Sequence, residues 1–198
     1  MPKIKICGLF RKEDIAFVNE AEPDYIGFVF AQSRRRVSPA DALRLRDGLK
    51  DGICPVGVFV NQPIEEILRL YRDGAIRMIQ LHGGEDESYI AELKALCAAP
   101  VIKAFRAEAL GDAGAVQTAA DFALFDNGSG GTGQTFDWSR LVSIENPWFL
   151  AGGISLDNID QAARLKPYCI DVSTGAETNG IKDRNKIIEL VRRVKQTV

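Results

Sequence analysis

Short apolar runs alternate with longer polar stretches along all 198 residues of this chain. Eight of these runs have the length and composition of strands: residues 3–7, 25–30, 55–60, 78–82, 101–105, 122–126, 148–152 and 169–173. Five of the stretches between them carry apolar residues at helical spacing, within residues 43–49, 64–71, 90–96, 159–165 and 187–194. Strands separated by crossovers of this length are expected to be parallel and connected in the right-handed sense.

Eight such units, with no linker or change of composition between them, predict one domain over residues 1–198, a (β/α)8 barrel. The chain is short for this fold, and a doubly wound open sheet is the alternative. The crossover after the fifth run is a poor helix, because it contains Gly111 and Gly114. Another helix has a clear start, since Ser38 is a favourable N-cap and Pro39 suits the first helical position.

The alternation of apolar residues predicts which side chains point into the barrel. Lys5 and Cys7 should point inward from the first run, and Gln80 and His82 from the fourth. The sixth run is apolar on both sides, so its pattern does not decide the direction of Asp126. Polar residues end several of the runs, and the carboxyl ends of the strands form the face where barrel enzymes do chemistry.

A glycine-rich stretch over residues 128–133 follows closely after Asp126. Its lack of side-chain bulk would let the backbone wrap closely around a ligand. A flexible linker is the alternative interpretation. The ligand-binding loop is favoured because the stretch is followed by side chains that can pack against other groups, namely Gln134, Phe136 and Trp138.

The loops after the seventh and eighth runs have the composition of an anion site. Their sequences are Ala-Gly-Gly-Ile-Ser over residues 151–155 and Ser-Thr-Gly-Ala over residues 173–176. Backbone amides in such turns bind anions without a lysine, and barrels commonly hold phosphate at these two loops. Either loop alone could be a simple turn, but together they predict a phosphate site formed by Gly152, Gly153, Ser173, Thr174 and Gly175.

Cys7 and Asp126 are the candidates for proton transfer. A cysteine at a strand end is more often packed than reactive, and it needs nearby donors or positive charge to act as a base. An acid role for Asp126 requires a protonated carboxyl group, which burial favours. The triplet Arg34–Arg36 follows the second run, and it is either a solvated charge run or the source of a guanidinium that grips a substrate carboxylate.

Composition argues against several classes of partner and site. The net charge of −2 provides no general attraction to nucleic acid or to an anionic membrane. No apolar stretch approaches the length of a membrane span, and the first residues lack the shape of a signal peptide, so a cytoplasmic protein with reduced thiols is expected. The four scattered cysteines and the single histidine, His82, lack zinc-site spacing, so no metal is expected.

Several longer motifs are distinctive, and they comprise residues 5–9, 27–30, 56–61, 80–83, 130–138, 150–154 and 171–177. Together they resemble the motifs of the phosphoribosylanthranilate isomerase family of tryptophan biosynthesis. The resemblance implies a (β/α)8 barrel that carries out the Amadori rearrangement of N-(5-phosphoribosyl)anthranilate, with no metal or organic cofactor. It also implies that the partner is a small phosphosugar and that the protein is a monomer or a homodimer.

The same resemblance implies roles for the candidate proton-transfer pair. Asp126 would be the general acid that protonates the ribose ring oxygen as the ring opens to a Schiff base. Cys7 would be the general base that takes the proton from the neighbouring sugar carbon. One group must donate while the other accepts, which suits a positioned pair.

Four further assignments follow from the resemblance. Arg35 would grip the substrate, with Arg36 as second choice because the triplet leaves the register open. His82 would lie near the anthranilate ring, and Asp171 near the sugar hydroxyls. The chain departs from the family at Phe10, where threonine is usual, and this departure affects the expected hydrogen bonding of the first loop.

Two other functions remain open on the sequence. A histidine-pathway barrel performs the same rearrangement on a related phosphosugar, but it typically carries aspartate where Cys7 stands and shows a half-barrel repeat not seen here. A phosphosugar-binding barrel that has lost catalysis belongs to another class of function. The presence of both Cys7 and Asp126 argues against it.

Overall fold

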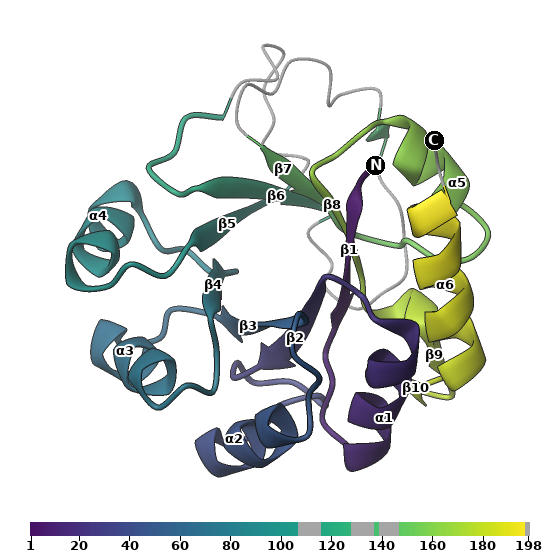
Figure 1. The fold of residues 1–198 in the computed structure, drawn as a ribbon. Coiled ribbons are helices and arrows are strands. Elements are labelled where there is room, and N and C mark those ends of the chain that lie inside the picture. The colour runs from purple at the N-terminus through teal and green to yellow at the C-terminus, as the bar shows by residue number, and fades with distance from the viewer. Residues whose placement is uncertain (107–115, 128–136, 139–146, 197–198) are drawn as a thin grey trace.

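The structure, a computed structural model, describes residues 1–106, 116–127, 137–138 and 147–196. Eight parallel strands close into a barrel in the order β1 to β8 (Figure 1). They are β1 (Lys3–Cys7), β2 (Tyr25–Val29), β3 (Cys54–Phe59), β4 (Met78–Leu81), β5 (Val101–Arg106), β6 (Phe122–Asp126), β7 (Trp148–Leu150) and β8 (Cys169–Val172). Because β1 pairs with both β2 and β8, the ring is closed and the open-sheet alternative is wrong.

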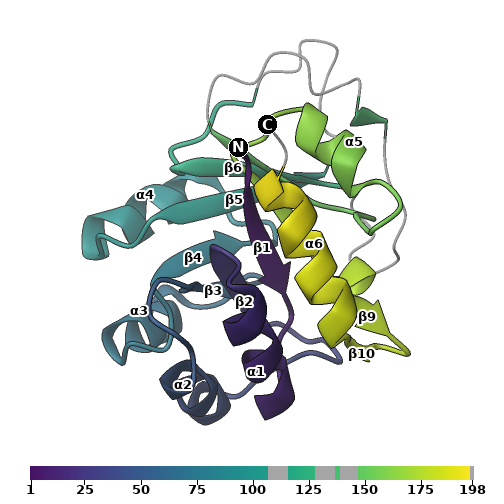
Figure 2. The same ribbon diagram turned by 45° about the vertical axis from the view of Figure 1, so that its right-hand side comes forward.

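The helices of the described residues lie around the outside of the barrel (Figure 1). They are α1 (Lys12–Ala21), α2 (Pro39–Asp47), α3 (Ile64–Arg72), α4 (Glu87–Leu96), α5 (Ile159–Arg164) and α6 (Arg184–Gln196). Figure 2 shows α6 lying across β1 and beside α1. The predicted glycine-rich loop over residues 128–133, with Gln134 and Phe136, lies outside the described residues, as do Gly111 and Gly114.

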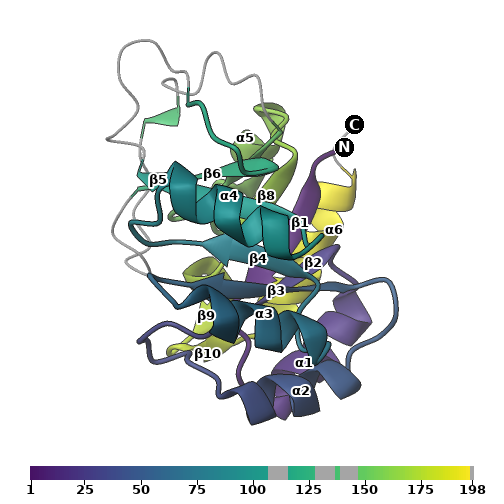
Figure 3. The ribbon, with the colours of Figure 1, turned by 90° about the vertical axis from the view of Figure 1, so that its left-hand side faces the viewer.

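A short hairpin follows β8. After a 3₁₀ turn at Thr174–Ala176, strand β9 (Glu177–Thr178) pairs antiparallel with β10 (Ile181–Lys182). In the side view of Figure 3, this hairpin and the N-terminus lie at opposite ends of the barrel. Among the described helices, none is long and apolar enough to cross a membrane.

The starts of α1 and α2 differ in how they are capped. Helix α2 begins as predicted, because the Ser38 hydroxyl accepts a hydrogen bond of 3.1 Å from the Asp41 amide, with Pro39 in the first turn. Helix α1, absent from the five predicted from apolar spacing, has no serine, threonine or aspartate at its N-cap. The buried Asp14 carboxylate instead accepts hydrogen bonds from the amides of Phe10 and Arg11.

Side-chain alternation separates two apolar layers. The inner layer fills the barrel and includes Tyr25, Val56, Met78, Ile102, Leu124, Phe149 and Cys169. The outer layer packs the strands against the helices and includes Ile4 and Ile6, so Lys5 points inward as predicted. In β6 the inner residue is Leu124, and Asp126, two positions later, therefore shares its face. The structure thus settles the direction that the apolar pattern of β6 left open.

Candidate active site

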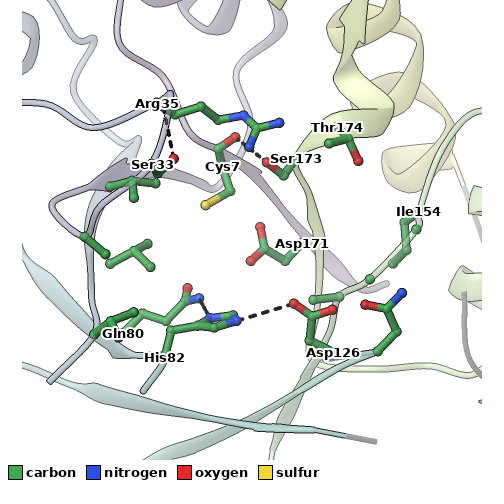
Figure 4. A pocket seen from close by; sticks show the side chains of 18 residues that line it. Cys7, Ser33, Arg35, Gln80, His82, Asp126, Ile154, Asp171, Ser173 and Thr174 are labelled. Atoms are coloured by element: carbon green, nitrogen blue, oxygen red, sulfur yellow. Dashed lines mark hydrogen bonds and ion pairs between the residues drawn. The ribbon is translucent and has the colours of Figure 1, made fainter. Parts of the chain in front are cut away.

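A cavity of about 240 Å³ opens at the carboxyl ends of the strands. Nine of the predicted site residues line it: Cys7, Arg35, His82, Asp126, Gly152, Gly153, Asp171, Ser173 and Thr174. They come from the ends of β1, β4, β6, β7 and β8 and from the segment after β2 (Figure 4). Two predicted residues, Arg36 and Gly175, are not part of this lining.

Cys7 lies at the end of β1, above a buried ion pair. Lys5 is fully buried, and its Nζ lies 2.8 Å from Oδ2 of Asp171. Asp171 Oδ1 is also buried and has no hydrogen-bond partner among the described residues. Space for the sulfur comes from Gly27 on β2, since a Cβ there would lie 2.6 Å from Cys7 Sγ. The arrangement places a thiol and an acceptor with spare capacity on the same wall of the cavity (Figure 4).

The surroundings of Cys7 have opposing effects on its ionisation. Burial raises the pKa of the Cys7 thiol above its ordinary value, and the negative charge of Asp171 raises it further. The positive charges of Lys5 and Lys182 oppose this rise without cancelling it. Burial also disfavours the charged form of Lys5, but Asp171 and Cys7 outweigh burial and raise the pKa of this lysine. These shifts favour the charged form of Lys5 and the neutral form of the thiol above it in the free protein.

Asp126 lies at the end of β6 and approaches His82. Oδ2 of Asp126 is 3.4 Å from Nε2 of His82, and His82 Nδ1 is 2.9 Å from Nε2 of Gln80. Asp126 Oδ1 is buried without a hydrogen-bond partner among the described residues. A Cβ at Gly152 would lie 2.7 Å from this oxygen, and the backbone there has a φ of 85°, so the position suits glycine on both counts.

Arg35 is held at the cavity by Glu177 of the hairpin after β8. Its Nε and Nη2 donate to Oε1 and Oε2 of Glu177 at 2.6 and 2.9 Å. Lys182 Nζ donates to the same carboxylate at 2.8 Å, and Arg34 adds a contact of 2.8 Å from outside. Burial alone would raise the pKa of Glu177, but the hydrogen bonds from Arg35 and Lys182 outweigh it and lower the pKa. The Arg36 side chain is exposed.

The two glycine-containing loops lie against each other at the rim. Gly152 and Gly153 have φ values of 85° and 67°, a conformation that side-chain-bearing residues rarely adopt. Gly175 does not face the cavity, but a Cβ there would lie only 1.9 Å from the Ile154 carbonyl oxygen. Its absent side chain therefore lets the loop after β8 contact the loop after β7, which brings Thr174 to the same cavity as Gly153.

Four residues of the site received no role from the sequence: Lys5, Gln80, Glu177 and Lys182. Alternation placed Lys5 and Gln80 inside the barrel, and a buried lysine needs an anionic partner, so that signal was available for Lys5. Nothing in the pattern pairs Glu177 or Lys182 with Arg35, because their contact depends on the folding of the hairpin.

Comparison with known proteins identifies the family. A sequence profile described as N-(5'-phosphoribosyl)anthranilate (PRA) isomerase matches residues 4–193. The N-(5'-phosphoribosyl)anthranilate isomerase of Endomicrobium trichonymphae is 54% identical over 197 residues, which cover 97% of this chain and 98% of that protein.

The chain belongs to the phosphoribosylanthranilate isomerase family.

Solved structures agree with this membership. The phosphoribosylanthranilate isomerase of Thermus thermophilus is 32% identical, with a TM-score of 0.86 and 98% of both chains covered. Another isomerase of this family was crystallised with reduced 1-(o-carboxyphenylamino)-1-deoxyribulose 5-phosphate. It is 30% identical, with a TM-score of 0.78 and 98% and 99% of the two chains covered. The predictions of a (β/α)8 barrel and of an isomerase of tryptophan biosynthesis are confirmed.

Proposed function

We propose that this phosphoribosylanthranilate isomerase works by general acid–base catalysis, with Asp126 as the acid and Cys7 as the base. The substrate would be N-(5-phosphoribosyl)anthranilate, and the product 1-(2-carboxyphenylamino)-1-deoxyribulose 5-phosphate. The observation that carries the proposal is that the Cys7 and Asp126 side chains line one cavity from different walls (Figure 4). A sugar between them can receive a proton on one side while losing one on the other.

The proposed rearrangement takes three proton transfers. Asp126 gives a proton to the ribose ring oxygen, the C1–O bond breaks, and the amine lone pair forms a cationic Schiff base. Cys7, as thiolate, takes the proton from C2, and the electron pair of that C–H bond neutralises the Schiff base to an enolamine. Tautomerisation then moves a proton from the C2 hydroxyl to C1, which gives the aminoketose. Asp126 and Cys7 recover their starting protonation states through exchange with solvent.

The bound intermediate itself helps to make Cys7 basic. The free thiol has a raised pKa because it is buried. A cationic Schiff base beside the sulfur adds a positive charge to that of Lys5, and two nearby cations favour the thiolate. Cys7 would therefore lose its proton once the cationic Schiff base has formed, which is the step before it accepts the proton from C2.

The remaining predicted residues suit substrate binding. Arg35, oriented by Glu177, can bind the anthranilate carboxylate, and His82 lies where it can contact the ring. Asp171 Oδ1 can accept a hydrogen bond from a sugar hydroxyl. For the phosphate we propose the loops at Gly152–Gly153 and Ser173–Thr174, since both face the cavity. The relative crystallised with a reduced phosphosugar compound supports this class of ligand.

Two variants test the acid–base pair. We expect Cys7→Ala and Asp126→Asn each to abolish turnover while the protein still folds and binds inorganic phosphate. Turnover is measured on purified phosphoribosylanthranilate, and folding by thermal melting. Cys54→Ala, at the opposite end of the barrel, and Asp47→Asn, on the surface, are the matched controls. Near-normal turnover in either active-site variant would refute the role assigned to that residue.

We also infer that residues 1–198 form one domain that works in the cytoplasm. All four cysteines are free, which suits a reducing compartment. A pulse of limited proteolysis tests the domain inference, because a second domain would yield a stable fragment shorter than the barrel.

A further inference from the structure

Three side chains form a line at one wall of the cavity (Figure 4). Gln80 and His82 come from β4 and the residue just after it, two positions apart and on the same face. Gln80 Nε2 lies 2.9 Å from His82 Nδ1, and His82 Nε2 lies 3.4 Å from Asp126 Oδ2. Gln80 is 1% exposed, so water cannot readily replace its amide group.

The chemistry of the three groups selects one form of the imidazole. A neutral imidazole has one N–H donor and one acceptor nitrogen, and an amide nitrogen only donates. With Gln80 Nε2 donating, His82 Nδ1 must accept, and the ring proton is on Nε2, facing Asp126. With the Gln80 amide in this orientation, the other tautomer would set two N–H groups against each other. The spacing of 3.4 Å is long for a hydrogen bond, as is common at catalytic groups before substrate binds.

We propose that Gln80 is a positioning residue that fixes His82 in the Nε2–H tautomer, so that His82 holds one oxygen of Asp126 and leaves the other for substrate. This inference rests on the proposed role of Asp126 as the general acid. The oxygen left over, Oδ1, is buried without a hydrogen-bond partner among the described residues. The absent side chain of Gly152 makes room for this oxygen, because a Cβ there would lie 2.7 Å from it.

The arrangement serves both stages of proton donation. Before transfer, His82 Nε2–H binds Oδ2 and directs the protonated Oδ1 of Asp126 toward the ring oxygen. After transfer, the same N–H stabilises the new carboxylate, so that one interaction orients the acid and then favours its conjugate base. Gln80 touches no reacting atom in this scheme and acts only through the imidazole.

The single histidine makes the tautomer directly measurable. Nitrogen NMR of the full chain, labelled with ¹⁵N at histidine and kept above the pH at which the imidazole becomes charged, shows two ring resonances that distinguish the tautomers. We expect His82 to be protonated at Nε2 in the unmodified protein. In Gln80→Glu the carboxylate can only accept, so the proton should move to Nδ1 or the ring should become doubly protonated. In Gln80→Met the preference should weaken to a mixture.

The kinetic expectation follows from the same contacts. Both Gln80 variants should lower kcat by about 10–100-fold, as is typical when the partner that orients a functional imidazole is lost, with a smaller change in KM. Gln161→Glu, an exposed change on α5, should alter neither the resonances nor kcat. Thermal melting identifies any variant that fails to fold, and the spectrum of the unmodified protein decides the tautomer in that case.

The outcomes separate this inference from the proposed function. An Nδ1–H tautomer in the unmodified protein overturns the inference, even if Asp126→Asn is inactive. Gln80 variants with an unchanged tautomer also overturn it. An Nε2–H tautomer together with an active Asp126→Asn leaves the role of Gln80 toward His82 intact and instead refutes Asp126 as the acid.

Discussion

Lys5 and Asp171 form a buried ion pair, 2.8 Å long, across the seam where the barrel closes. The two residues are register partners on β1 and β8, the first and last strands of the ring. The pair is therefore part of the sheet closure as well as of the cavity wall beneath Cys7. Its position links the stability of the barrel to the charge at the proposed base.

Removal of the lysine should destabilise the protein strongly. Lys5→Met leaves the Asp171 carboxylate buried without its partner, and breaking a buried ion pair typically costs about 3–5 kcal/mol. Lys3→Met, on the same strand and less deeply buried, is the control and should cost far less. Urea unfolding measures both free energies. Equal losses in the two variants would show that the Lys5 pair contributes little.

The thiol of Cys7 should titrate above its ordinary range in the free protein. Burial raises its pKa, so the thiol is neutral at physiological pH and the thiolate forms only on the alkaline side. The difference in thiolate absorbance between the unmodified protein and Cys7→Ser isolates this group from the other three cysteines. A Cys7 signal already present at neutral pH would contradict the prediction.

Arg35 should matter more for substrate binding than its neighbour. The Arg35 side chain is 10% exposed and faces the cavity, whereas that of Arg34 is 57% exposed. A hydrogen bond to a charged group contributes about 1.5–3 kcal/mol, so Arg35→Ala should raise KM roughly 10–100-fold. Arg34→Ala, measured by the same steady-state assay, should change it little. Similar effects from both variants would mean that the wrong arginine of the triplet was chosen.

Glu177 should make the protein sensitive to acid. Its pKa is lowered in the folded state by Arg35 and Lys182, so the unfolded chain binds more protons there as the pH falls. The stabilisation is present above the ordinary pKa of glutamate and is lost as the pH falls from there through the lowered pKa of the folded state. In urea unfolding measured at a series of pH values, Glu177→Gln should reduce the loss of unfolding free energy at acid pH, whereas Glu92→Gln, on the surface, should not. An unchanged acid loss in Glu177→Gln would argue against the buried network.

A methyl group at Gly175 should weaken phosphate binding. The added Cβ would lie 1.9 Å from the Ile154 carbonyl oxygen, so the two rim loops must separate. Calorimetric titration with inorganic phosphate should therefore show weaker binding by Gly175→Ala. Gly48→Ala provides the control, because its Cβ would meet ordinary contacts no closer than 3.6 Å. Unaltered affinity in the first variant would place the phosphate site elsewhere.

The sequence predicted the parts of this molecule that depend on periodicity. The eight apolar runs lie within two residues of the observed strands, and alternation placed Lys5 and Gln80 inside the barrel because the pleat repeats every two residues. The start of α1 was missed because Asp14 caps it from the third helical position, without a typical N-cap residue.

Contacts between loops were beyond sequence reasoning. Arg35 was chosen over Arg36 through a motif, but only the fold reveals Glu177 as its partner, 142 residues away along the chain. The line from Gln80 through His82 to Asp126 likewise joins two strands that do not pair with each other. Such relationships depend on distances across the barrel, which no local pattern encodes.

The hairpin after β8 has a consequence for synthesis of the chain on the ribosome. Until residues 169–182 emerge, Lys5 lacks its counter-ion and Arg35 lacks the carboxylate that orients it. The proposed catalytic centre is therefore incomplete until β8 and the hairpin have been synthesised, because the lysine beneath the proposed base and the proposed substrate-binding arginine each take a carboxylate partner from that segment.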